Sequence, residues 1–84
     1  MHQSLKDRTK IINDIHQERS RQDYLHPDKL SISDRYVTLG EEMGEVSTAI
    51  QNDDKENLYQ ELIQVAAEAV RMAEQVIKED VNAD

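Results

Sequence analysis

The chain has no cysteine, tryptophan or phenylalanine, and only one proline and two glycines in 84 residues. Without cysteine it cannot form disulfides or thiolate metal sites, and no thiol nucleophile is available. Aromatic residues make up 4% of the chain, so few large side chains are available for a core. The shortage of proline and glycine leaves little turn punctuation and favours long helices.

Basic residues are also scarce: 10 lysines and arginines stand against 18 acids, giving a formal net charge of −8. This balance argues against nucleic-acid or anionic-membrane partners, which require clustered cations. No apolar run approaches the roughly 18 residues that span a bilayer, and the polar segment 1–10 lacks an apolar signal-peptide core. We therefore expect a soluble protein located in the cytoplasm.

The length predicts a single helical domain over residues 1–84. A domain of this size buries only about 60% of the surface of its unfolded chain, so a monomer is marginally stable. With neither disulfides nor a structural zinc site, association with further copies is the expected remedy. The prediction is a homodimer or a tetramer.

Three helices are predicted from the periodicity of the apolar residues. The first covers about residues 4–22 and ends before His26-Pro27, because the residue before proline is pushed out of the helical region. The second begins at Ser31 or Ser33, since either side chain can cap a helix. The third begins near Asp54, and residues 79–84 are expected to fray.

The resulting fold class is all-α, because no segment alternates with the period of a strand. The second and third helices form an antiparallel pair, which completes a four-helix-type bundle by oligomerisation. Gly40 and Gly44 lie within the second helix, where each costs roughly 1 kcal/mol relative to alanine. Two interpretations stay open for them: close approach of another helix or ligand, or glycines tolerated in a well-packed helix.

Acidic residues concentrate at 41–45 (Glu-Glu-Met-Gly-Glu) and again at 61–64 (Glu-Leu-Ile-Gln). At helical spacing, Glu42 and Glu61 flank the apolar stripes of their helices, so antiparallel packing brings them to one seam. Mg²⁺ prefers oxygen ligands and usually keeps several waters, so two to four side-chain oxygens suffice. In an acidic chain such spacings also arise by chance, and a solvated acidic face is the alternative interpretation.

Other chemistries lack their motifs. The sequence has no Gly-rich phosphate loop, no Ser/His/Asp set and no Glu-x-x-His pattern. Asp23 and His26 have ligand spacing, but they straddle the expected helix end, which favours a capping role. Tyr24, Tyr36 and Tyr59 can stack on a base, although packing in a core this poor in aromatics is the better interpretation.

The acidic runs resemble a known family. Residues 41–46 followed by 61–65 are similar to the Glu-Glu-x-x-Glu and Glu-x-x-Asp motifs of the MazG-like all-α nucleoside triphosphate pyrophosphohydrolases. Residues 18–23 and the following His26-Pro27-Asp28 resemble the lead-in of phage-type MazG-like proteins. The resemblance extends over about residues 15–77.

This resemblance implies cleavage of a nucleoside triphosphate, ribo- or deoxyribo-, to the monophosphate and pyrophosphate with Mg²⁺, or Mn²⁺, as cofactor. The implied metal ligands are Glu42, Glu45 and Glu61, and Glu41 is the implied catalytic carboxylate that orients or deprotonates the attacking water. Gln64 stands where the family pattern has aspartate and contributes no charge. Glu68, one turn further on, is a candidate to compensate as a ligand.

Cationic partners for a triphosphate are few in this region. Arg71 and Lys55 are the candidates for substrate binding on the third helix, although Arg71 has Glu68 and Glu74 at the spacing of ordinary helical ion pairs. The leading function is thus an enzyme, a nucleoside triphosphate pyrophosphohydrolase. The alternatives are a catalytically weak nucleotide-binding or protein-interaction module, and an acidic helical assembly without a ligand.

Overall fold

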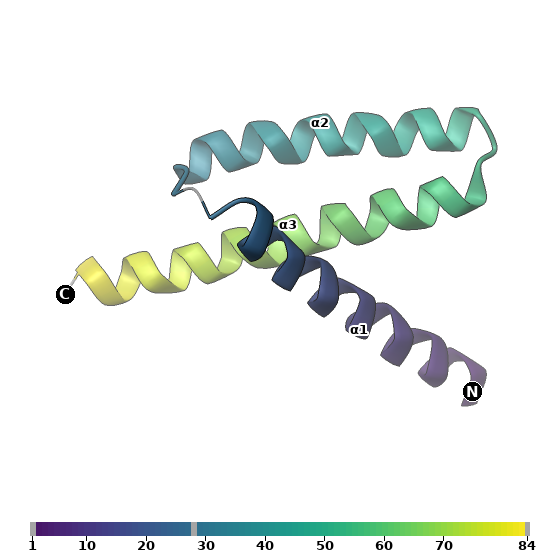
Figure 1. Ribbon diagram of the computed structural model, residues 1–84, viewed down its shortest axis with the longest axis horizontal. Coiled ribbons are helices and arrows are strands. Elements are labelled where there is room, and N and C mark those ends of the chain that lie inside the picture. Colours follow the sequence, from purple (N-terminus) through teal and green to yellow (C-terminus); the bar gives the residue numbers. More distant parts are fainter. Residues whose placement is uncertain (1, 28, 84) are drawn as a thin grey trace.

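The computed structural model contains three helices, α1 (His2–Leu25), α2 (Ile32–Gln51) and α3 (Lys55–Ala83). It describes residues 2–27 and 29–83, and the side chains of 4–27 and 29–79. Every regular element in this part of the chain is a helix, which confirms the predicted all-α class (Figure 1). Asp84 and the side chains of 80–84 lie outside the described residues, so the expected fraying there stays a prediction.

The helix ends follow local chemistry. α1 ends at Leu25, directly before His26-Pro27. The His26 amide donates the last backbone hydrogen bond of this helix to the Gln22 carbonyl at 2.8 Å. Ser31, rather than Ser33, caps α2, because its hydroxyl accepts from the Asp34 amide at 3.1 Å. Both boundaries agree with the sequence signals, with α1 extending a turn beyond the predicted end.

The connection between α2 and α3 is a tight Schellman turn. The Asp53 amide donates to the Ile50 carbonyl and the Asp54 amide to the Ala49 carbonyl, each at 3.1 Å. Asp53 has φ 53°, a left-handed conformation that aspartate tolerates better than most residues. The Asp54 carboxylate then accepts from the Asn57 amide at 3.1 Å, and so caps α3 as predicted.

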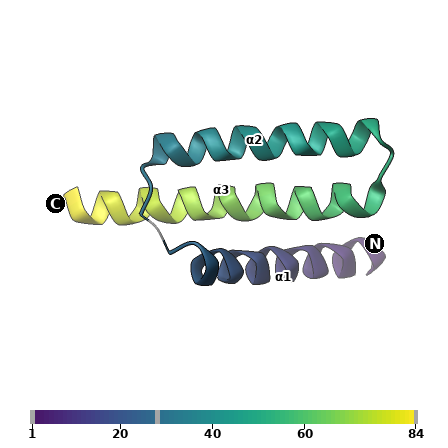
Figure 2. The same ribbon diagram turned by 45° about the horizontal axis from the view of Figure 1, so that its top comes forward.

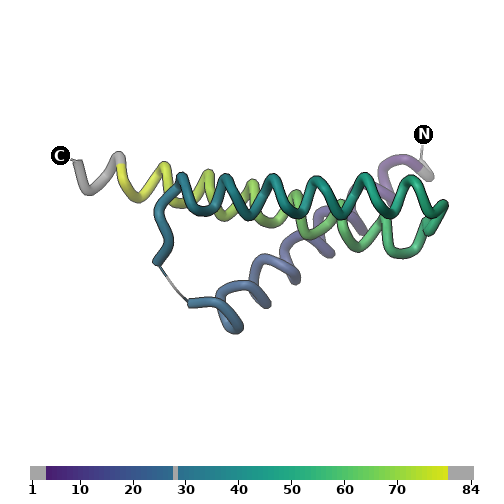
Figure 3. The backbone as a smooth tube through the Cα atoms, turned by 90° about the horizontal axis from the view of Figure 1, so that it is seen from above, coloured from purple at the N-terminus to yellow at the C-terminus, as the bar shows by residue number. Residues whose placement is uncertain are grey.

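α3 is the central element of the molecule. It contacts both α2 and α1, whereas no comparable packing joins α1 to α2 in the described part of the chain. α2 and α3 lie side by side and antiparallel (Figure 2), and α1 runs obliquely across α3 (Figure 3). Because the short turn after α2 reverses the chain, the acidic runs at 41–45 and 61–64 face each other along one seam.

The apolar core is small. Its buried members in the described residues are Val46, Ala49, Ile63 and Ala67. Polar contacts attach α1 to α3. Arg19 of α1 donates two hydrogen bonds to the Glu74 carboxylate of α3 at 2.8 and 2.9 Å, and the Tyr59 hydroxyl of α3 donates to Asp14 of α1 at 2.5 Å. A core of four modest side chains leaves much apolar surface uncovered, as the chain length predicts.

Large apolar side chains remain exposed along α2 and α3. On α2 they recur every seven residues at Tyr36, Met43 and Ile50, which are 54–68% exposed. On α3 the exposed stripe includes Val76 and Ile77. A Cβ at Gly40 or Gly44 would meet nothing within 4 Å, so no described part of the chain packs closely against those glycines.

None of the helices in the described part of the chain combines the length and apolar character needed to cross a bilayer.

We predict that Ile63→Ala lowers the free energy of unfolding by about 2–4 kcal/mol, because Ile63 is buried and the side chains around it cannot fully close the cavity. Urea unfolding followed by circular dichroism measures the change. Leu5→Ala is the matched control, since Leu5 is 61% exposed on α1. Equal losses in the two variants would show that Ile63 is not a core residue.

Candidate metal and phosphate site

Carboxylates from all three helices gather at the seam between α2 and α3. Glu42 of α2 lies within electrostatic range of Glu45 on its own helix, of Glu61 and Glu68 on α3, and of Glu18 on α1. Four of these five acids are sequence-predicted site residues, and Glu18 is new. We refer to Glu18, Glu42, Glu45, Glu61 and Glu68 as the acidic cluster.

Glu42 has the most perturbed environment of the acidic cluster. Burial, followed by the like charges of Glu68, Glu45, Glu61 and Glu18, raises the pKa of its carboxyl from 4.5 to about 7. Its Oε2 atom is buried and has no hydrogen-bond partner. A buried carboxylate oxygen without a donor is unfavourable, and a cation or a proton would relieve it.

Glu61 faces the same seam from α3. Burial raises the pKa of its carboxyl, and so do a hydrogen bond to Glu45 and the charge of Glu45. The Oε2 atom of Glu61, like that of Glu42, is buried without a hydrogen-bond partner.

Glu68 and Gln64 continue the α3 side of the seam. Glu68 is 4% exposed, and its Oε1 lies 3.9 Å from Nη1 of the buried Arg35. Gln64 is half-buried and lines a cavity whose wall also includes members of the acidic cluster and residues of the connection between α1 and α2. The two residues extend the site from the carboxylates toward an arginine.

This cavity has a volume of about 410 Å³ and draws residues from every helix. We call it the central cavity. Its walls carry both acidic and basic side chains, and two of these pairs lie close together: Arg21 with Glu18 at 3.1 Å, and Arg35 with Glu68 at 3.9 Å. Its lining residues are Glu18, Arg21, Gln22, His26, Leu30, Arg35, Thr38, Glu42, Gln64, Glu68 and Arg71.

The lining of the cavity includes arginines that the sequence analysis did not assign to the site. Arg71 was a predicted substrate-binding residue, and the fold adds Arg35 of α2 and Arg21 of α1. Arg35 precedes Glu42 by seven residues, a spacing that places both on one helix face. That signal was available in the sequence, whereas nothing local to α1 indicates that Arg21 reaches the cavity.

Arg71 does not form the helical ion pairs that its spacing allows. Glu74 is held by Arg19, and no carboxylate among the described side chains lies within 4 Å of the Arg71 guanidinium. The guanidinium donates instead to the backbone carbonyl of His26. Arg71 therefore lines the central cavity without a carboxylate partner of its own among the described side chains.

Four predicted site residues, Glu41, Glu45, Glu61 and Lys55, are absent from the lining of this cavity, and two of them lie outside the acidic cluster as well. Glu41 is exposed on α2 and is absent from the cavity lining. Lys55 is exposed at the first turn of α3, about 24 Å along the helix from Arg71 at 1.5 Å per residue. The structure thus joins Arg71 to the acidic cluster but does not bring Lys55 to the same site.

The side chains of this seam present oxygen atoms, which are the ligands that Mg²⁺ prefers. In the described part of the chain, no three His, Asp or Glu side chains are positioned to hold one ion as they stand. Mg²⁺ in phosphate sites, however, is commonly held by one or two carboxylates together with waters and the substrate phosphates. The buried, partnerless Oε2 atoms of Glu42 and Glu61 are suitable oxygen donors, so the residues fit such an ion.

Comparisons of the chain with protein-family models, with curated proteins and with solved structures found no match. The similarity to the MazG-like family consequently rests on the motif residues alone.

We predict that the metal-free protein loses stability as pH rises between 4.5 and about 7, the ordinary and the raised pKa of Glu42. In that window the folded state holds a proton that the unfolded state has released, so deprotonation costs folding free energy. We expect a loss of about 1 kcal/mol, because solvent screens the half-exposed carboxyl. Thermal melting in the presence of a chelator, across this pH range, measures it.

Glu42→Gln is the control, because it removes the titrating group and should flatten this pH dependence. Millimolar Mg²⁺ should restore stability to the parent protein above the raised pKa, and should do so less in the variant. A melting temperature that rises with pH in the metal-free parent would contradict the placement of Glu42.

Proposed function

We propose that the protein is a Mg²⁺-dependent nucleoside triphosphate pyrophosphohydrolase that forms a monophosphate and pyrophosphate. The observation that carries this proposal is that Glu18, Glu42 and Glu68 of the acidic cluster line one cavity together with Arg35 and Arg71, while Glu45 and Glu61 lie within electrostatic range of Glu42. A nucleoside triphosphate bound to Mg²⁺ needs both kinds of group, since carboxylates hold the ion and guanidinium groups hold the phosphate oxygens. The resemblance of residues 41–46 and 61–65 to the family motifs supports the same reaction.

The residues divide by charge. Glu42, Glu45 and Glu61 would hold the ion, with Gln64 and Glu68 as additional oxygen donors on α3. The chemistry that Mg²⁺ supplies when bound is neutralisation of phosphate charge and acidification of a coordinated water. Arg35 and Arg71 would orient the phosphates from the opposite wall.

Glu41 is the proposed orienting group for the attacking water, from its position beside Glu42. Its carboxylate is exposed in this chain, so it must reach the reacting water from the rim of the seam. A carboxylate in this role accepts the proton as the water attacks phosphorus.

A binding protein with weak or no turnover is the second candidate. Gln64 favours it, because an amide oxygen without charge stands where the family pattern has a carboxylate. The exposure of Glu41 favours it as well. Such a protein would bind a nucleotide in the central cavity, or present its helices to a protein partner, without breaking the phosphate anhydride.

We predict pyrophosphate release from a panel of ribo- and deoxyribonucleoside triphosphates in the presence of Mg²⁺ or Mn²⁺. Glu42→Gln should lower kcat/KM by about 100-fold or more, because it removes a buried ligand carboxylate. Gln64→Asp should raise the affinity for Mg²⁺, since it adds a charge to the donor set. A coupled assay for pyrophosphate, with the metal concentration varied, measures both effects.

Tight nucleotide binding without pyrophosphate release would favour the binding-protein alternative. No gain in Mg²⁺ affinity for Gln64→Asp would remove position 64 from the ligand set. Glu56→Gln is a suitable control for charge alone, because Glu56 is exposed in the first turn of α3.

We further propose that two copies pair through the exposed stripes of α2 and α3 to complete a four-helix bundle. Tyr36, Met43 and Ile50 recur at the seven-residue spacing of helix–helix seams, and Gly40 and Gly44 leave the α2 backbone open beside them. Within this chain nothing covers that surface in the described residues. Burying it would supply the apolar area that four core side chains do not.

We predict that the protein sediments as a dimer or larger assembly and that Met43→Glu shifts it toward the monomer. A charge placed in an apolar helix seam must be desolvated, which opposes association. Sedimentation velocity across a concentration series measures the shift. Leu5→Glu on α1 is the matched control, and a monomeric parent protein would contradict the proposal.

A further inference from the structure

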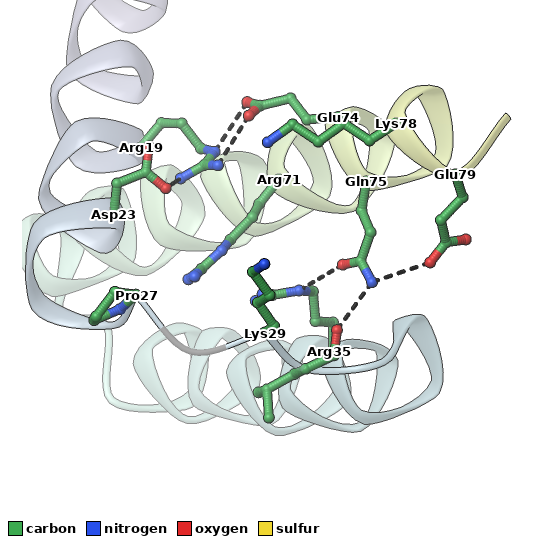
Figure 4. A pocket seen from close by; sticks show the side chains of 11 residues that line it. Arg19, Asp23, Pro27, Lys29, Arg35, Arg71, Glu74, Gln75, Lys78 and Glu79 are labelled. Atoms are coloured by element: carbon green, nitrogen blue, oxygen red, sulfur yellow. Dashed lines mark hydrogen bonds and ion pairs between the residues drawn. The ribbon is translucent and has the colours of Figure 1, made fainter. Parts of the chain in front are cut away.

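A second pocket lies on the other side of Arg35 and Arg71, between the end of α1, the connection after it and the C-terminal half of α3 (Figure 4). We call it the arginine pocket. Its volume is about 360 Å³, within the range of small-ligand sites. Its lining residues are Arg19, Asp23, Pro27, Lys29, Leu30, Arg35, Arg71, Glu74, Gln75, Lys78 and Glu79.

The charge of this pocket is opposite to that of the chain. Five lining residues are basic and three are acidic, although the whole protein has 10 basic and 18 acidic residues. Half of all the lysines and arginines therefore line a single pocket. Like charges gathered in this way repel one another, and a bound anion would offset that repulsion.

Two of the three acids in the pocket pair with a single arginine, so these three residues together keep one net negative charge. Arg19 binds the Glu74 carboxylate through two nitrogens and donates to Asp23 at 2.6 Å. Because the Arg19 side chain is 13% exposed, this arrangement holds it as part of the wall. Arg35 already lies 3.9 Å from Glu68 and donates to Gln75, which leaves the cations of Lys29, Arg71 and Lys78 beside the carboxylate of Glu79.

Arg71 is the central cation of the pocket. Its side chain extends from α3 toward the segment around Pro27, and the residue is 9% exposed. Its hydrogen bond to the His26 carbonyl uses one of five N–H donors and brings no negative charge. Burial, then the nearby charges of Arg35 and Arg19, lowers the pKa of Arg71, while the carboxylates of Glu68 and Asp23 act in the opposite direction.

We propose that the arginine pocket is a binding site for a phosphate-type anion and that it works without a divalent metal. A guanidinium presents N–H groups in a planar fork that matches phosphate oxygens, and Arg71 would supply this contact. Lys29 and Lys78 are exposed and would close on the anion from the rim. The excess of cations suits a multiply charged anion such as pyrophosphate, either free or as part of a nucleotide.

This inference does not rest on the proposed function, because that function requires the acidic cluster and an ion. The two sites share only Leu30, Arg35 and Arg71 among their lining residues. A metal-free anion site and a metal-dependent catalytic site can thus be tested independently of each other.

The test is a calorimetric titration of the full chain with inorganic pyrophosphate in the presence of a chelator, at constant ionic strength. We expect saturable binding that Lys29→Ala and Lys78→Ala each weaken by about two- to fivefold, as for exposed charge contacts. Arg71→Lys keeps the charge but loses the fork, and should weaken binding by about tenfold or more. Glu42→Gln should leave it unchanged or tighten it, since an acidic neighbour is neutralised.

Lys6→Ala is the matched control: it removes an exposed lysine of α1 about 20 Å along the helix from Arg19. Equal weakening by Lys6→Ala and the rim variants would show non-specific charge attraction and overturn the site. Binding seen only with Mg²⁺ would also overturn it while leaving the proposed function intact. If Arg71→Lys does not fold, the two rim variants still decide, because their side chains are exposed.

A parallel titration with a nucleoside triphosphate and its monophosphate, also without metal, distinguishes the two sources of the anion. Tighter binding of the triphosphate than of pyrophosphate, lost in Lys78→Ala, would assign the pocket to the phosphate chain of a nucleotide. Equal or weaker binding would assign it to the inorganic anion. Saturable metal-free binding without hydrolysis under any condition would support this site and contradict the enzyme.

Discussion

The burial of charged side chains along one face of α3 is the constraint on which the rest of the structure depends. Glu68 and Arg71 are 4% and 9% exposed, and Arg35 of α2 is 6% exposed between them. Placing ionised groups in this position is costly unless opposite charges lie close, and removing one partner from such an arrangement is more destabilising than removing an exposed charge. The place where the three helices meet is therefore polar, with the apolar core confined to the α2–α3 turn side.

This polar junction explains why the three helices bury little apolar surface against one another. α1 is held against α3 by Arg19–Glu74 and Tyr59–Asp14 rather than by a continuous apolar stripe. Side-chain pairs of this kind fix the orientation of a helix but bury little apolar area. The exposed stripes on α2 and α3 follow from the same arrangement, since the charged face of α3 occupies positions that an isolated globular domain would fill with leucine or isoleucine.

Two arginines link the two candidate sites. Around the central cavity acidic and basic side chains alternate, since Arg21 pairs with Glu18 and Arg35 lies 3.9 Å from Glu68. Arg35 and Arg71 form the shared wall, so an anion on either side of it would meet the same pair of guanidinium groups. A ligand carrying both a metal ion and phosphates would satisfy the partnerless Oε2 of Glu42 and the cationic wall together.

Much of this architecture follows from local sequence. Ser31 and Asp54 begin α2 and α3 because each side chain bonds a free amide, and His26-Pro27 ends α1 because proline cannot continue it. The acidic runs reach one seam because they have helical spacing and a three-residue turn reverses the chain between them. Arg35 and Glu42 are seven residues apart, so the sequence alone predicts that both side chains lie on the same face of α2.

The contributions of α1 could not be predicted in this way. Glu18 and Arg21 reach the central cavity, and Arg19 reaches Glu74, only because α1 crosses α3 at an oblique angle. Periodicity within one helix defines its faces but carries no information on the angle and height at which another helix packs against it. The sequence by itself determined the helices, their ends and the acidic seam. The tertiary structure alone decided which cations join that seam, because crossing geometry depends on contacts between residues far apart in the chain.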